Sequence, residues 1–121
     1  MSSDSLREYT TLDGSRIVEL VRPEREGSES LSLAQATVEP GTSTLRHRHP
    51  EAEEVYYVLR GEGALEIGGV VEAVTPGDAR LIPPGVEHRA TAMGPEPLVI
   101  LCACSPPYTH HDTEITEPVQ V

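Results

Sequence analysis

Two histidines separated by a single residue, His47 and His49, are the residues of this chain best suited to chemistry. In an extended strand, side chains two positions apart point to the same face, so both imidazoles can reach one point in space. Glu54 follows in the next predicted strand, and His88 lies in a distant part of the chain. Three imidazoles and one carboxylate form a donor set that suits a divalent first-row transition metal.

Residue parity indicates how the carboxylate meets the histidines. Glu54, Tyr56 and Val58 share one face of their predicted strand, so Glu54 stands beside the histidines if this face turns inward, and Tyr56 lies one step deeper. Glu53 is the alternative residue for the ligand role. Glu54 is preferred because the residues from Val55 onward follow an uninterrupted strand pattern. Tyr56 is either a catalytic donor beside the ligands or a core aromatic residue whose hydroxyl is satisfied elsewhere.

The third histidine closes a second run, which extends from Gly77 to His88 and contains Pro83-Pro84-Gly85. Proline followed by glycine is a strong turn signal. We therefore expect a tight turn that delivers His88 into the interior.

Turn signals of this kind recur along the whole chain, and between them lie runs of about five to eight residues rich in Val, Ile, Leu, Thr and Tyr. This rhythm predicts an all-β sandwich or barrel. The predicted strands are 15–22, 31–38, 42–49, 54–60, 63–67, 70–74, 79–82, 87–92 and 97–104. Gly68-Gly69 predicts a hairpin turn. Residues 1–6 and 113–121 are expected to be loose ends, although the second segment can also lie across the surface.

Composition narrows the classes of function. The formal charge is −11 and there is no run of basic residues, which argues against a nucleic-acid partner. The chain contains no Lys, which excludes Schiff-base chemistry through lysine. The first twenty residues lack the apolar core of a signal peptide, and the longest apolar stretch, Leu98 to Cys104, is too short to span a membrane. We expect a cytoplasmic protein without a membrane partner.

The residues singled out above resemble the two sequence motifs of the cupin family. The first motif, G-x5-H-x-H-x(3,4)-E-x6-G, is matched by Gly41, His47, His49, Glu54 and Gly61. The second motif, G-x5-P-x-G-x2-H-x3-N, is matched by Gly77, Pro83, Gly85 and His88, whereas Ala92 replaces its final Asn. The resemblance implies an all-β double-stranded β-helix (jelly-roll) barrel, with residues 1–121 forming a single cupin domain and metal-binding motifs at 41–61 and 77–92.

The resemblance also implies a metal bound by His47, His49, Glu54 and His88, and Fe, Mn, Ni, Zn and Cu all stay open as its identity. An octahedral ion with these ligands keeps open positions for a small-molecule substrate or dioxygen. The leading hypothesis is a metal-dependent enzyme with dioxygenase-like oxidoreductase chemistry on a small oxygenated substrate, in which Glu54 can act as base and Tyr56 as donor. A non-redox isomerase, lyase or decarboxylase is one alternative, and a non-catalytic metabolite- or sugar-binding module is another.

The stretch from Leu98 to Cys104 is apolar on both faces, although a small barrel covers only the inner one. We therefore predict a homodimer, in which the N-terminal strands between residues 7 and 38 pack. Cys102 and Cys104 lie on one face of this stretch, with Cα atoms at the upper edge of disulfide geometry. Buried free thiols are the preferred interpretation, and a strained bridge is the alternative.

Overall fold

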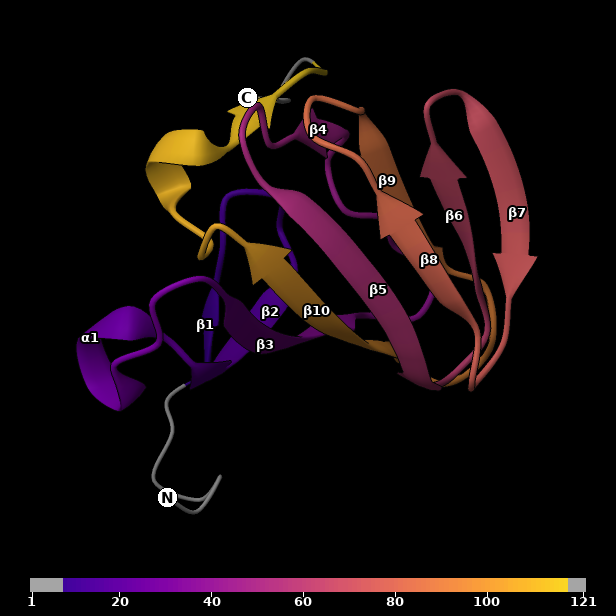
Figure 1. Cartoon of the computed structure of the whole chain (residues 1–121). Coiled ribbons are helices and arrows are strands. Elements are labelled where there is room, and N and C mark those ends of the chain that lie inside the picture. Colours follow the sequence, from indigo (N-terminus) through magenta and orange to yellow (C-terminus); the bar gives the residue numbers. More distant parts are fainter. Residues whose placement is uncertain (1–7, 118–121) are drawn as a thin grey trace.

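The computed structural model describes residues 8–117, which form two antiparallel sheets that pack against each other (Figure 1). The six-stranded sheet has the order β1-β2-β3-β10-β5-β8 and comprises β1 (Glu8–Thr10), β2 (Arg16–Val21), β3 (Ser32–Val38), β10 (Leu98–Ser105), β5 (Glu53–Arg60) and β8 (Ala79–Ile82). The five-stranded sheet has the order β11-β4-β9-β6-β7 and comprises β11 (Glu114–Ile115), β4 (His47–Arg48), β9 (His88–Ala92), β6 (Gly63–Ile67) and β7 (Val70–Val74).

The helices are short and lie outside the sheets. The α-helix α1 (Pro23–Glu26) begins with a proline and ends at Gly27, whose left-handed backbone is a common helix terminator. A 3-10 helix, His110–Asp112, precedes β11. Within residues 8–117, no helix has the length and apolar character needed to cross a membrane.

The predicted all-β fold is confirmed, and every predicted strand except 42–49 appears within one residue of its expected ends. The hairpin predicted at Gly68-Gly69 is also present, because Ile67 pairs with Val70. The short strands β1 and β11 were not predicted. The N-terminal strands β2 and β3 extend the six-stranded sheet, in which β3 pairs with β10.

The predicted strand 42–49 is wrong in extent, because only His47 and Arg48 form β4. The backbone before β4 pairs with β9 only in part. Thr44 N donates to Ala90 O, and Leu45 N donates to the carbonyl of Asp13 in the turn after β1. The contact of Leu45 with Asp13 interrupts the pairing of this segment with β9, so residue alternation alone overestimated the strand.

The second segment predicted as a loose end is ordered where it is described. Glu114 and Ile115 form β11, which pairs with β4 and covers that edge of the five-stranded sheet. The prediction of loose ends at residues 1–6 and 118–121 lies outside the described residues.

The core lies between the two sheets and is built without Phe or Trp. Burial alternates along β5, so that Glu54, Tyr56 and Val58 are buried while Val55 and Tyr57 are exposed. This is the alternation that parity predicted for this strand. It places one face of β5 toward the second sheet.

The turn from β5 to β6 depends on a glycine. Gly61 has a φ of +82°, and a Cβ atom placed there would lie 2.2 Å from the carbonyl oxygen of Pro97. Gly69 in the β6–β7 turn has a similar φ of +83° but open space around it. The two glycines therefore share the backbone requirement and differ in the space available.

We expect Gly61→Ala to destabilise the fold more than Gly69→Ala. Both substitutions place a side chain in the left-handed region, at a cost of about 1–2 kcal/mol. Gly61→Ala also forces a methyl group against a backbone oxygen, which adds about 1–3 kcal/mol. Urea unfolding of both variants measures the difference. Equal losses would show that the close approach to Pro97 is unimportant.

Candidate metal centre

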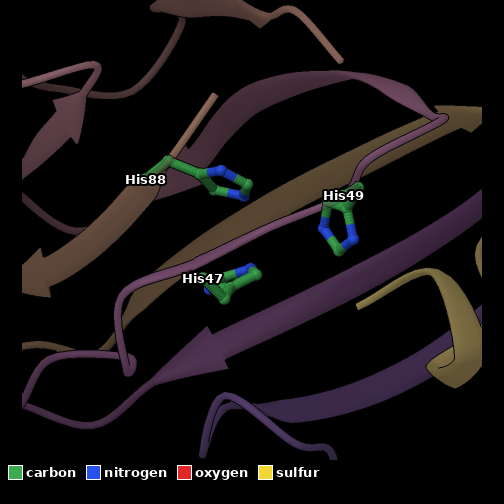
Figure 2. A group of neighbouring side chains, drawn as sticks. All are labelled: His47, His49 and His88. Carbon is green, nitrogen blue, oxygen red and sulfur yellow. The ribbon is translucent and has the colours of Figure 1, made fainter. Parts of the chain in front are cut away.

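Three histidines from two neighbouring strand segments converge between the sheets. His47 in β4 is the direct register partner of His88 in β9, and His49 follows two residues after His47. One nitrogen of each ring lies within 4.8 Å of the corresponding nitrogens of the other two. All three residues are buried. Figure 2 shows the three rings pointing toward a common centre.

The outer nitrogen of each ring is held by the backbone. Nδ1 lies 2.8 Å from Leu45 O in His47, 3.0 Å from Val86 O in His88 and 3.2 Å from Asp112 O in His49. A carbonyl oxygen can only accept a hydrogen bond, so these contacts assign the ring proton to Nδ1. The Nε2 lone pairs are then directed inward, as in metal-binding histidines.

Glu54 reaches the histidines from the opposite sheet. Its Oε1 lies 3.3 Å from His49 Nε2 and 3.5 Å from His88 Nε2. Its Oε2 accepts a hydrogen bond from the thiol of Cys104, its register partner in β10, at 3.0 Å. The rival residue, Glu53, is exposed on the outer face. Of the two glutamates, only Glu54 is therefore placed at the histidines.

The charges of these groups depend on each other. Burial alone would raise the pKa of Glu54, but His49 and His88 outweigh that effect and lower the pKa to about 2. Burial, followed by the neighbouring His88, lowers the pKa of His47. For His49, burial also acts to lower the pKa, but the Glu54 carboxylate raises it. Glu54 is therefore a carboxylate, and His47 is neutral near pH 7.

The residues fit a divalent metal. Among the described residues, Glu54 Oε1 and His88 Nε2 are buried polar atoms with no hydrogen-bond partner. Buried polar atoms without a partner are costly, and here several electron-donating atoms face one another. A cation between them would satisfy all of these atoms at once, and three nitrogens with one oxygen suit a transition metal.

Tyr56 lies on the same face of β5 as Glu54 and is buried, with its ring centroid 5.6 Å from that of His88. It belongs to the hydrophobic core and also lines the cavity beside the histidines. Burial, followed by the nearby Glu54 carboxylate, raises the pKa of Tyr56 well above its ordinary value. Its hydroxyl therefore keeps its proton at neutral pH.

Cys102 and Cys104 are free and buried, in agreement with the preferred interpretation of the sequence. Both thiols line the cavity. Burial, followed by the Glu54 carboxylate, raises the pKa of each thiol. They are protonated side chains, and Cys104 donates its proton to a hydrogen bond that holds Glu54.

Two residues at the site were missed from the sequence. Asp13, in the turn between β1 and β2, places Oδ2 3.5 Å from His47 Nε2. Tyr108 lies edge-on to His49 with ring centroids 5.7 Å apart, and its hydroxyl is 3.0 Å from Thr11 Oγ1. Asp13-Gly14 was visible only as a turn signal, and no local signal marked Tyr108.

The cavity beside the histidines is small, with a volume of about 50 Å³. Small side chains from β3 and from the turn before β2 form much of one wall: Ser15, Ser32, Ala34 and Ala36. A site of this size accepts a few water-sized groups.

Comparisons with known proteins agree with this architecture. Residues 34–104 match the family model of the cupin domain. An uncharacterized protein of Methanocaldococcus jannaschii, MJ1618, is 43% identical over 114 residues, which cover 94% of this chain and 91% of that protein. The chain belongs to the cupin family.

Solved structures confirm the double-stranded β-helix. A conserved protein of Klebsiella pneumoniae with such a domain superposes with a TM-score of 0.74 at 21% identity, covering 98% of this chain and 96% of that one. The polyketide cyclase RemF of Streptomyces resistomycificus superposes with a TM-score of 0.75 at 23% identity, covering 87% and 77%. At this level of identity, the likeness extends to the fold alone.

The placement of the two adjacent glutamates gives a matched test of the ligand set. We expect Glu54→Gln to weaken Mn(II) binding by about 100-fold or more, because losing a ligand exceeds the usual 10- to 100-fold cost of losing a residue that orients one. Glu53→Gln should leave the affinity unchanged. Isothermal titration calorimetry measures both, and equal affinities in the two variants would exclude Glu54 as a ligand.

Proposed function

We propose that this protein is a metal-dependent enzyme that acts on a small oxygen-bearing molecule. The observation that carries the proposal is the convergence of His47, His49, His88 and Glu54, with inward-facing nitrogens and a buried, unpartnered carboxylate oxygen. Four protein ligands leave part of the coordination sphere of an octahedral ion for other molecules. A divalent ion held there would act as a Lewis acid toward a substrate oxygen and, if redox-active, could exchange electrons.

Glu54 and Tyr56 are the groups of the chain placed to handle protons. Glu54 is a carboxylate, and it can take up a substrate proton when it is not bound to the ion. Tyr56 keeps its proton and lies beside His88, so it can donate a hydrogen bond or a proton to substrate. We propose both as catalytic residues.

Cavity size supports a small substrate. The space of about 50 Å³ matches a compact acid, diketone or similar molecule better than a fused aromatic ring. Ser15, Ser32 and Thr113 supply polar groups among apolar ones along the wall. We therefore propose that the substrate is an oxygen-rich compound with few carbon atoms, and this class should be tested first.

We propose dioxygenase-like chemistry as the leading reaction type. The donor set of histidines with a carboxylate supports this reaction type. Non-haem iron oxygenases use ligands of the same kinds, and their ligands also leave coordination positions of the iron open. The second candidate is a non-redox isomerase, lyase or decarboxylase. The protonated hydroxyl of Tyr56 beside His88 favours this candidate. Isomerase, lyase and decarboxylase reactions need no oxidant, and a proton donor can assist them.

Anaerobic reconstitution with Fe(II), followed by oxygen-electrode measurements against small diketones, hydroxy acids and thiols, tests the leading reaction. We expect oxygen uptake with at least one substrate and its loss in His88→Ala. The exposed His111→Ala is the matched control and should retain uptake. Turnover under strict anaerobiosis would instead support the non-redox candidate. Ligand binding without any turnover would contradict the proposal of an enzyme.

We also propose that a second copy of the chain covers the outer face of the six-stranded sheet. Val55, Tyr57 and Leu81 are exposed there, and Val55 in β5 is the register partner of Leu81 in β8. Adjacent apolar side chains of this kind form a continuous patch, which a partner chain would remove from water.

Sedimentation of matched variants tests the dimer. Leu81→Arg places a charge in the patch, whereas Val71→Arg places one on β7, where the side chain is 64% exposed against 56% for Leu81. We expect the unaltered protein and Val71→Arg to sediment as dimers at micromolar concentration, and Leu81→Arg as a monomer. A monomeric unaltered protein would contradict the proposal.

A further inference from the structure

A second carboxylate faces the metal centre from a turn outside both sequence motifs. Asp13 lies between β1 and β2 and is buried, with 8% of its surface exposed. Its two carboxylate oxygens have different surroundings. Oδ1 accepts hydrogen bonds from Ser15 N at 2.9 Å and from Ser15 Oγ at 2.7 Å. These two contacts explain how the turn is held, and they leave Oδ2 free to point elsewhere.

Oδ2 points at the inner nitrogen of His47, 3.5 Å away. The Nδ1 of His47 carries the ring proton because it donates to Leu45 O at 2.8 Å, so its Nε2 presents a lone pair to the carboxylate. Both residues line the cavity, and two electron-donating atoms that face each other there repel unless a cation or a hydrogen-bond donor lies between them. A turn-stabilising role for Asp13 accounts for Oδ1 but gives no reason for this orientation of Oδ2.

The position of Asp13 is tied to the histidine segment. Its backbone carbonyl accepts a hydrogen bond from Leu45 N at 2.7 Å, and Leu45 is the residue whose own carbonyl orients His47. The carboxylate and the imidazole are therefore fixed to each other through one backbone residue. A pair held in this way is preorganised for a shared ligand.

We propose that Asp13 is a fifth protein ligand of the metal, next to His47. The inference rests on the proposed metal site. A separation of 3.5 Å lets both atoms contact one cation, because ligand atoms lie about 2.0–2.2 Å from such an ion. Glu54 approaches His49 and His88, whereas Asp13 approaches His47, so each of the three histidines has one of the two carboxylates beside it.

A second carboxylate changes what the centre binds. Three neutral imidazoles with two carboxylates carry a charge that balances a divalent ion, and the added oxygen shifts the preference toward Mn(II) and Fe(II) and away from softer ions. An octahedral ion would also keep one position for water or substrate instead of two. The substrate would then attach through a single oxygen, unless Asp13 releases the ion.

Asp13→Asn in the full chain tests this role, with Asp78→Asn as the matched control. Asp78 also holds a turn, since its Oδ2 accepts a hydrogen bond from Thr75 N at 2.8 Å, but it does not line the cavity. We expect Asp13→Asn to weaken Mn(II) binding by about tenfold or more in calorimetry, and Asp78→Asn to leave it unchanged. Equal Mn(II) affinities in the two variants would overturn the role of Asp13 while leaving the histidine site intact.

The unaltered protein provides a second measurement that does not depend on the folding of a variant. Broadening of the Mn(II) electron paramagnetic resonance lines in ¹⁷O-enriched water counts the water ligands on the ion. We expect one water in the unaltered protein and two in Asp13→Asn, as six-coordination requires. Two waters in the unaltered protein would overturn the inference. Failure of the unaltered protein to bind Mn(II), Fe(II) or Zn(II) would instead overturn the proposed function, and the inference with it.

Discussion

The structure depends on a cluster of buried electron-donating atoms, the imidazole nitrogens of three histidines and a carboxylate oxygen of Glu54, that face one another. The ring protons of three histidines are turned outward to backbone carbonyls. The inner nitrogens of His49 and His88 face Glu54, and that of His47 faces Asp13. Such an arrangement is unfavourable in a low-dielectric interior unless a cation joins it. Backbone carbonyls nevertheless hold the three rings, and the Cys104 thiol holds Glu54, so the packing of the two sheets offsets the energetic cost of assembling the site.

The two sheets divide the work of holding the site. The five-stranded sheet sets the histidines, because His47 and His88 are register partners across β4 and β9. The six-stranded sheet sets the carboxylate, because Glu54 is paired with Cys104 across β5 and β10. A change in register on either side would turn its residues from the cavity to the outer face. The same alternation that buries Val58 in the core therefore also delivers Glu54 to the histidines.

Much of the fold and of the candidate site could be predicted from the sequence, because both depend on the local spacing of residues. Residues two apart share a strand face, and this rule placed His47, His49 and Glu54 correctly on inward faces. Asp13 and Tyr108 could not be placed, because they reach the histidines through long-range packing of a turn and a C-terminal segment. The predicted strand 42–49 was too long for a related reason. The N–H group of Leu45 donates to a distant turn and interrupts the pairing with β9, which no local pattern reveals.

Two of the four tyrosines of this chain, which contains no tryptophan, lie against the clustered histidines. Tyr56 and Tyr108 have ring centroids 5.6 and 5.7 Å from those of His88 and His49. Half of the tyrosines of this protein therefore lie next to the histidine cluster. Tyrosine fluorescence is thus an intrinsic probe, and its quenching by a paramagnetic ion can report whether the site is occupied without any added label.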